Sequence, residues 1–275
     1  VDQNLFNQFE EPMSSTVSSR EENTLLVSLE QNTQPGVPYG LRGEVSDKSG
    51  NTLSFASYFT GYNENVPKLI LSEIQTEYSK PKAEFVELYA QTSGNLAGVC
   101  IYSAYDGDAK RVELPSIDVN AGEYIVVHLR KVEETCVNET GSNLALSGGA
   151  YSSTARDIWI ENASARLGKT DVILLEERAG GKIMDALCIA ESKHAVWQKD
   201  SQAQAAKRAF DCGAWPDGSG IENALIADKV TATRTISRQG NLAAAKPCGK
   251  NGWIVTASKG ATPGLPNSTT AYVEK

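Results

Sequence analysis

The chain has 275 residues, of which 40% are hydrophobic and 22% are charged, and it carries a formal net charge of -8 at pH 7. This length and composition allow two small globular domains with buried cores and argue against wholesale disorder. The acidic balance and the absence of clustered Lys and Arg exclude nucleic acid as an expected partner, because binding to phosphate backbones is built from such clusters.

The first 65 residues predict a small β domain. Asp47-Lys-Ser-Gly-Asn51 is typical of a hairpin turn, because Gly and Asn tolerate positive φ. Phe9-Glu-Glu-Pro-Met13 and this turn together resemble a bacterial Ig-like domain of cell-surface and S-layer proteins. The segment is short for a complete sandwich, so some strands are expected to be missing or very brief. Strands are expected at residues 25–29, 39–45 and 53–59.

The turn-rich segment Gly61-Tyr-Asn-Glu-Asn-Val-Pro67 is interpreted as a linker, which gives domains at residues 1–65 and 66–275. Many short strands without intervening amphipathic helices favour a sandwich over a parallel βαβ architecture in the second domain. Its strands are expected at 69–74, 84–90, 98–104, 111–114, 123–129, 157–161, 171–177, 182–189, 231–238 and 253–256.

Two insertions interrupt this pattern of strands. Residues 133–156 are polar and rich in Gly and Ser, which is typical of a long loop. In residues 192–210, apolar side chains recur at helical spacing and predict one short helix that ends before Gly213. The side chains with this spacing are Trp197, Ala203, Ala206 and Phe210.

Several separated blocks of the second domain resemble the lamin tail domain. They are Leu69-Ile-Leu-Ser-Glu-Ile74, Glu84-Phe-Val-Glu-Leu-Tyr89, a middle block over 167–187, Thr233-Arg-Thr-Ile-Ser-Arg238 and Ala261-Thr-Pro-Gly-Leu-Pro-Asn267. The resemblance covers residues 67 to 267 in the order of its blocks. It implies an immunoglobulin-like β-sandwich, so the expected fold is all-β, with two immunoglobulin-like β-sandwich domains and one short helical insertion in the second.

Ala163-Ser-Ala-Arg-Leu-Gly-Lys-Thr170 is close to the phosphate loop G-x-x-x-x-G-K-[ST]. That loop requires its first glycine and a helix behind it. Ala163 occupies the glycine position, and Asp171-Val-Ile-Leu-Leu175 is β-branched and strand-like. We therefore expect a turn leading into a strand and no bound nucleotide.

Glu73, Glu84 and Glu87 are candidates for paired carboxylates of glycoside hydrolysis. Glu84 and Glu87 lie three apart on one strand, so they point to opposite faces and one of them faces packed side chains. An isolated buried charge is costly, and an arginine of the 233–238 block is the expected partner. We favour this structural interpretation and predict an ion pair between Glu87 and Arg238.

Other kinds of chemistry have weaker support. There is no G-x-S-x-G elbow, and His128 and His194 are interpreted as structural residues. The turns Asp106-Gly-Asp108 and Asp47-x-x-Gly-Asn51 could hold calcium, but turns use the same residues without metal. We therefore predict no catalytic residue, no cofactor and no metal.

The five cysteines form no C-x-x-C pair, which disfavours a zinc site. One or two disulfides are expected in a secreted β protein, and Cys212–Cys248 is the predicted bridge because both residues lie in loop-like surroundings. Five reduced thiols in a cytosolic protein is the alternative. Cys100 and Cys188 lie in apolar strand patterns and fit buried thiols equally well.

The resemblances imply a non-catalytic, extracytoplasmic protein that serves in binding, adhesion or scaffolding. Its expected partner is an unidentified protein or cell-surface ligand. The chain starts at Val1 and not at Met, so we expect that a signal peptide or lipid-anchor segment has been cut away from this sequence. Through such a lipid anchor, the native protein would be tethered to a membrane. The alternative is an accessory module of a secreted hydrolase or nuclease.

Overall fold

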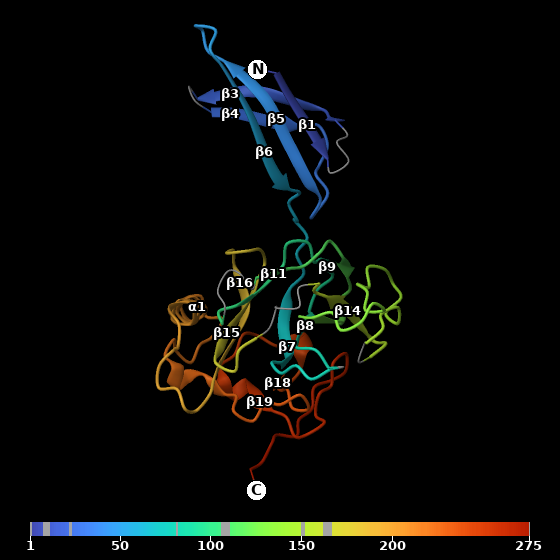
Figure 1. Ribbon diagram of the computed structural model, residues 1–275, viewed down its shortest axis with the longest axis vertical. Helices are drawn as coiled ribbons and strands as arrows, with labels where there is room; N and C mark the ends of the chain where they lie inside the picture. The colour runs from blue at the N-terminus through green and yellow to red at the C-terminus, as the bar shows by residue number, and fades with distance from the viewer. Residues whose placement is uncertain are drawn as a thin grey trace. The chain divides into compact units, whose positions relative to one another are not determined.

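The structure is a computed structural model that describes residues 2–7, 12–21, 24–80, 82–105, 111–149, 152–161 and 167–274 (Figure 1). The chain divides into two compact units, Val1–Asn65 and Val66–Lys275, the ranges expected from the sequence. Strands dominate both units, and the described part of the chain has one α-helix, in the second unit. The all-β sandwich fold with one helical insertion is therefore confirmed. No helix of the described residues is long and apolar enough to cross a membrane.

The N-terminal unit contains a four-stranded antiparallel sheet in the order β2-β1-β5-β6 and a two-stranded sheet, β3-β4. The expected turn joins β5 to β6. There the Asp47 carboxylate accepts hydrogen bonds from the backbone of Ser49 and Asn51, and Gly50 has φ +87°. The strands are β1 (Asp2–Asn7), β2 (Pro12–Met13), β3 (Ser15–Glu21), β4 (Thr24–Leu29), β5 (Pro38–Ser46) and β6 (Thr52–Thr60).

The C-terminal unit contains two main sheets. The six-stranded sheet has the order β14-β13-β8-β7-β18-β19, and the five-stranded sheet has the order β11-β10-β15-β16-β17. The six-stranded sheet contains β7 (Leu69–Gln75), β8 (Phe85–Ala90), β13 (Tyr124–His128), β14 (Ala155–Trp159), β18 (Ile236–Arg238) and β19 (Trp253–Val255). The five-stranded sheet contains β10 (Cys100–Ser103), β11 (Val112–Glu113), β15 (Asp171–Glu176), β16 (Ile183–Ala190) and β17 (Leu225–Ile226). A small pair is formed by β9 (Gly94–Asn95) and β12 (Asp118–Val119).

The apolar core lies between the two main sheets. Leu71, Leu88 and Val86 contribute from the six-stranded sheet, and Ile173 and Leu187 contribute from the five-stranded sheet. All five residues are 0% exposed. Burying such side chains contributes about 1.5–3 kcal/mol each, so this core is the main source of stability of the unit.

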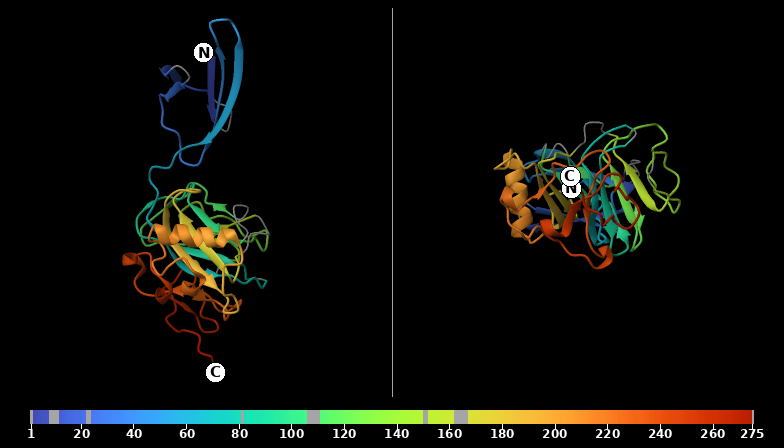
Figure 2. Two further views of the ribbon diagram at one scale, coloured as in Figure 1. Left: turned by 90° about the vertical axis from the view of Figure 1, so that its left-hand side faces the viewer. Right: turned by 90° about the horizontal axis from the view of Figure 1, so that it is seen from below.

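The helix α1 (Asp200–Asp211) packs against β15 and β16, and Figure 2 shows it lying across their sheet. Its buried face is made by Ala205, Ala206 and Ala209. Phe210 is 45% exposed and Trp197 precedes the helix. Of the apolar residues predicted at helical spacing, only Ala206 lies on the buried face of the helix, so that prediction was wrong in detail. Small alanines let the helix approach the sheet closely, which is why a wider stripe is not needed. The helix ends at Cys212, before Gly213 at φ +77°, as predicted.

A buried ion pair connects the two main sheets. Arg238 of β18 pairs with Asp185 of β16, and the two side chains are 1% and 0% exposed. Both also bond to the backbone of Leu71, which lies next to a register shift between β7 and β8. The Leu71 N–H donates to Asp185 Oδ2 (2.8 Å), and the Leu71 C=O accepts from Arg238 Nε (2.6 Å). The Arg238 guanidinium lies over the Trp253 ring, 4.3 Å from its centroid.

The substitution Asp185→Ala would leave the Arg238 charge buried without its carboxylate. We expect it to lower the free energy of unfolding by about 3–5 kcal/mol. Urea unfolding followed by Trp fluorescence at about pH 8 reports on this unit alone, because all four Trp residues lie after residue 66.

Lys207→Ala is the matched control, since its pair with Asp211 is exposed at 69% and 54%. Such a pair contributes about 0–1 kcal/mol. If Asp185→Ala lowers the free energy of unfolding no more than this control does, the buried ion pair does not stabilise the unit as proposed.

Candidate functional site

Three of the ionisable side chains singled out from the sequence, Glu73, Glu87 and His128, lie on one side of the six-stranded sheet, which we call the outer face. Cross-strand register places Glu73 opposite Glu87, Glu87 opposite Val126, and Val126 opposite Asp157. Residues of 262–267 donate hydrogen bonds to Glu73 and Glu87, while Glu139 and Ser147 of the 133–149 segment bond to the Asp157 N–H and the Trp159 indole. Two segments, 133–149 and the Thr-Pro-Gly-Leu-Pro-Asn block at 262–267, therefore cover the outer face.

Glu73 and Glu87 are both 0% exposed, and among the described residues no ion pair joins either of them to an arginine. Glu73 accepts hydrogen bonds from the hydroxyl of Thr235 and from the backbone of Thr262 (2.9 Å). Glu87 Oε1 lies 2.7 Å from the Ser72 hydroxyl oxygen, and its other oxygen accepts from the Gly264 N–H (2.5 Å). The predicted burial of Glu87 is confirmed, but the predicted ion pair with Arg238 is wrong. Arg238 is turned to the other side of the sheet, where Asp185 holds it.

The environment of Glu87 favours its neutral form. Burial raises the pKa of Glu87 well above its ordinary value, and the charge of Glu73 raises it further, against hydrogen bonds from Ser72 and Gly264. Burial also raises the pKa of Glu73. The Ser72 hydroxyl lies 2.7 Å from Glu87 Oε1 and 3.2 Å from Asn267 Oδ1. It has one proton, so it satisfies both oxygens only if a protonated Glu87 donates to Ser72 and Ser72 donates to Asn267.

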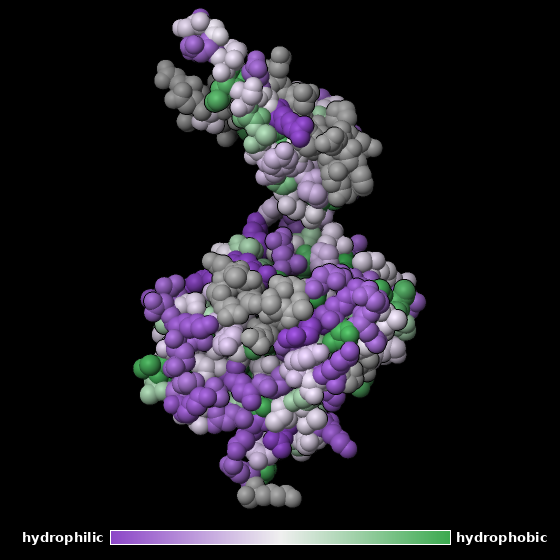
Figure 3. All heavy atoms as spheres, viewed as in Figure 1, coloured by the Kyte–Doolittle hydropathy of each residue, from purple (hydrophilic) through white to green (hydrophobic). Residues whose placement is uncertain are grey.

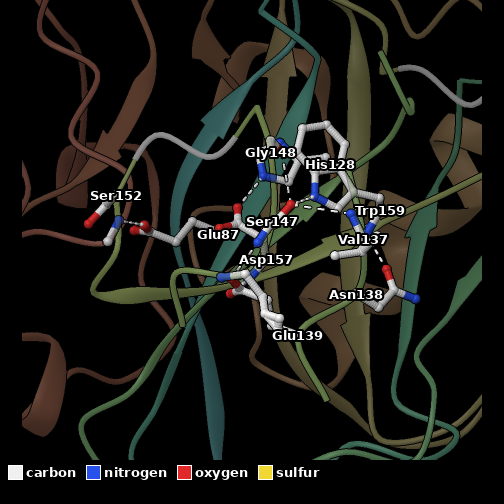
Figure 4. Close-up of polar contacts among 12 residues, drawn as sticks. Glu87, His128, Val137, Asn138, Glu139, Ser147, Gly148, Ser152, Asp157 and Trp159 are labelled. Atoms are coloured by element: carbon white, nitrogen blue, oxygen red, sulfur yellow. Dashed lines mark hydrogen bonds and ion pairs between the residues drawn. The ribbon is translucent and has the colours of Figure 1, made fainter. Parts of the chain in front are cut away.

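A second cluster on the outer face is built around His128 (Figure 4). His128 Nε2 lies 2.5 Å from Asp157 Oδ1, and its ring stacks on Trp159 with centroids 3.7 Å apart. Burial lowers the pKa of His128, although the hydrogen bond to Asp157 opposes this shift. A neutral imidazole that donates from Nε2 to the Asp157 carboxylate is consistent with this direction.

Glu139 connects this cluster to the 133–149 segment. One of its oxygens accepts from the Asp157 N–H (2.8 Å), and the other accepts from the N–H groups of Leu146 (2.9 Å) and Ser147 (3.1 Å). The Trp159 indole donates to the Ser147 hydroxyl (2.7 Å). Since Glu139 is 1% exposed, its carboxylate serves as an internal anchor for the loop.

These groups include acids and a base, but they have no exposed surface at which a substrate could react. Glu73, Glu87 and His128 are 0% exposed and Asp157 is 1% exposed. Their protons and lone pairs go mostly to neighbouring backbone and hydroxyl groups. The arrangement therefore fixes two loops onto the sheet, and its chemical capacity as described is to hold protons inside the fold.

An open cavity of about 580 Å³ lies elsewhere, at the N-terminal end of α1. Two pairs of oppositely charged side chains line it, and Lys199 Nζ, also in the lining, donates to the Tyr105 carbonyl. Lys169 Nζ lies 3.5 Å from Glu77, and Arg130 makes two hydrogen bonds to Glu84 at 3.1 and 3.2 Å. The Arg130 guanidinium covers one side of the Tyr78 ring, 4.1 Å from its centroid.

The cavity also has an unsatisfied polar group. The Thr76 hydroxyl lines it, is buried, and has no hydrogen-bond partner among the described residues.

The last four residues of the near-phosphate stretch, Leu167 to Thr170, line this cavity. Residues 163–166 lie outside the described residues, but Thr170 leads into the strand β15, as predicted. The Gly168 N–H donates to the buried Asp171 carboxylate (3.1 Å) and is not available to a phosphate. Burial raises the pKa of Asp171 to about 6.

The predicted disulfide between Cys212 and Cys248 is wrong, because the structure has five free cysteines. The Cys212 thiol lies at the end of α1 and donates to the Ala209 carbonyl (3.4 Å). Cys248 lies beside Arg238, whose Nη1 donates to its sulfur (2.8 Å). Each sulfur is thus engaged within its own local structure.

Neither calcium turn gains support from the structure. Asp106 and Asp108 lie outside the described residues. Both Asp47 oxygens accept hydrogen bonds from the turn, including one from Asn51 Nδ2 (2.7 Å). In the part of the chain that the structure describes, no three His, Cys, Asp or Glu side chains are grouped as metal ligands would be.

Comparison with known proteins identifies the second unit. A family model, TP_1001_2nd, described as "protein second domain", matches residues 67–255, more than half of the chain. The chain belongs to this TP_1001 second-domain family. The match contains the outer-face residues of β7, β8, β13 and β14 and ends before the 262–267 segment.

An uncharacterized protein of Treponema pallidum (strain Nichols) is 30% identical over 184 residues, which are 64% of this chain and 47% of that protein. The matched part thus spans about half the length of that relative. A solved structure of a DUF4876 family protein from Bacteroides thetaiotaomicron VPI-5482 covers 94% of this chain and 88% of its own, at 10% identity and a TM-score of 0.36.

We expect Glu87→Gln to be tolerated, because glutamine reproduces the shape and the hydrogen bonds of a protonated glutamate. The folded protein keeps the Glu87 proton at pH values where the unfolded chain has released it. This stabilisation is complete below the ordinary glutamate pKa and is lost as pH rises through the raised pKa. The variant should match the wild type at about pH 4 and exceed it by about 1 kcal/mol or more at about pH 8.

Urea unfolding at both pH values measures this difference. Glu84→Gln is the control, since it removes a buried carboxylate that does pair with an arginine, Arg130, and it should destabilise the protein at about pH 8. A Glu87→Gln variant that loses more stability at high pH than at low pH would contradict the neutral Glu87.

Proposed function

We propose that this chain is a non-catalytic binding protein that acts outside the cytoplasm, in adhesion or scaffolding. The observation that carries the proposal is the commitment of its buried acids and of His128 to internal hydrogen bonds. A hydrolase that used Glu73, Glu84 or Glu87 would need these carboxyl groups at an accessible surface. A binding module needs them only as structural elements.

We also propose that the two units are an Ig-like and a lamin-tail-like module. The arrangement of the sequence blocks supports the second assignment. Glu73 and Glu87 come from the first two blocks, Asp185 from the middle block and Arg238 from the fourth, while the last block supplies Thr262 and Gly264. Residues that are far apart in the sequence thus bond to one another in two groups, one on each side of the six-stranded sheet, which gives the presence of these blocks in one chain a physical reason.

The extracytoplasmic location and a lipid tether remain part of this proposal. They rest on the resemblance of both units to modules of surface proteins. With five free cysteines, disulfide bonding no longer contributes to the argument.

The cavity beside α1 is the ligand site that we assign to this function. Its volume is in the range of small-molecule sites, about 300–1,000 Å³. Because Lys169 and Arg130 are already paired with carboxylates, we expect it to suit an uncharged or zwitterionic polar ligand, such as a sugar unit or a peptide segment, better than a phosphate. Tyr78, 42% exposed, adds an aromatic surface at its edge. Figure 3 shows that hydrophilic side chains dominate one face of this unit, without a broad apolar patch.

An array of oligosaccharides and short peptides, probed with the wild-type protein, tests the proposal. Members that bind should lose about tenfold or more in affinity with Lys169→Glu, which places two acids side by side at Glu77, and with Tyr78→Ala. Lys207→Glu is a control with the same charge change on an exposed helix surface, and it should leave binding intact.

Two outcomes would contradict the proposed function. One is binding that the cavity variants do not change. The other is turnover of any array member that Glu73→Gln or Glu87→Gln abolishes, since this would make the buried carboxyl groups catalytic.

A further inference from the structure

The strand β6 of the N-terminal unit is an unprotected sheet edge. It pairs with β5 over nine residues without a register shift and lies at the end of the described four-stranded sheet. Its sequence, TLSFASYFT, has no charge and no proline. Leu53 and Tyr58 are 65% and 69% exposed. Native proteins protect edge strands with charges, prolines, bulges or short length, and β6 has none of these features.

The hydrogen bonds at the two ends of the β5–β6 ladder show which backbone groups face outward. The Asp47 N–H donates to the Asn51 C=O (2.9 Å), and the Gly61 N–H donates to the Val37 C=O (2.8 Å). In an antiparallel pair, bonded and non-bonded positions alternate. The odd-numbered residues of β6 therefore bond to β5. The even-numbered residues point their N–H and C=O groups away from the sheet, at Thr52, Ser54, Ala56, Tyr58 and Thr60.

We propose that β6 pairs in antiparallel fashion with β6 of a second copy of this chain. Outward groups can bond only to outward groups, so even-numbered residues must face even-numbered residues. The register that pairs all nine residues has its two-fold axis at Ala56. It joins the four-stranded sheets of two copies into one continuous sheet.

The side chains of β6 are complementary to themselves in this register. Leu53 faces Phe59 of the second copy, and both are exposed in the single chain, at 65% and 39%. They occupy a non-hydrogen-bonded position, where side chains approach most closely. Since β6 carries no charge, self-pairing opposes no like charges. Two-fold pairing of one patch with itself is also the commonest way in which soluble proteins form dimers.

Disulfide trapping tests this register directly. At the two-fold axis, the Cα atoms of Ala56 in the two copies would lie about 5.5 Å apart, a distance that a disulfide spans. In a Cys212→Ser background, which removes the exposed native thiol, Ala56→Cys should oxidise to a covalent dimer. Ser46→Cys is the control. It is exposed on β5, one strand away from the interface, and should remain monomeric on a non-reducing gel.

Sedimentation velocity provides the second measurement. Ala56→Lys would place two positive charges opposite each other on the axis and should raise the dimer Kd at least tenfold, whereas Ser46→Lys should not. A wild-type chain that stays monomeric at high concentration, together with no trapping of Ala56→Cys, would overturn the proposal. If Ala56→Lys prevents the N-terminal unit from folding, the trapping result alone decides.

Discussion

Two carboxyl groups face each other across β7 and β8, and the structure of the outer face depends on their protonation states and hydrogen bonds. Glu73 and Glu87 occupy opposed positions of the ladder and have no exposed surface. Two ionised carboxylates at such a site repel each other and lose their hydration, so one of them favours its protonated form. The remaining lone pairs are satisfied by Thr262 and Gly264, which ties the C-terminal segment to the sheet. The same segment reaches the Ser72 and Arg238 carbonyls through Asn267.

This constraint explains why the outer face resembles an active site in composition but not in access. The buried acids, His128 and Trp159 lie beneath the segments 133–149 and 262–267. Each segment bonds to residues of the outer face and shields them from solvent. We therefore place the proposed function on surfaces outside this buried network. The cavity beside α1 and the uncharged edge of β6 are the two surfaces that we propose for binding, in keeping with the proposed role in adhesion or scaffolding.

The sequence predicted the elements that have a local signal. Continuous apolar runs located β7, β8, β13, β15 and β16, and the Asp-x-x-Gly-Asn turn located the β5–β6 hairpin. It also predicted the burial of Glu87, because Glu87 shares its strand face with Phe85 and Tyr89. It failed where the answer depends on contacts between distant elements. Arg238 meets Asp185 and not Glu87 because of how the two sheets face each other.

Asp157, Glu139 and Asp185 were missed in the sequence, although a charged residue inside an apolar run, as at Asp185 in Ile183–Ala190, is a usable signal. Strand β14 begins at Ala155, inside the predicted 133–156 loop, because it is built by parallel pairing with β13.

The protonation state of Glu87 is the central claim, and carboxyl ¹³C NMR measures it directly. With the Glu side-chain carboxyl carbons labelled and Glu87→Gln used to assign the resonance, the Glu87 signal should keep the shift of a protonated carboxyl well above about pH 4.3, the ordinary pKa of a glutamate in a model peptide. It should change only at clearly higher pH. A Glu87 resonance that titrates at or below this ordinary value would contradict the account. It would mean that Glu87 is an ordinary carboxylate stabilised by its hydrogen bonds to Ser72 and Gly264.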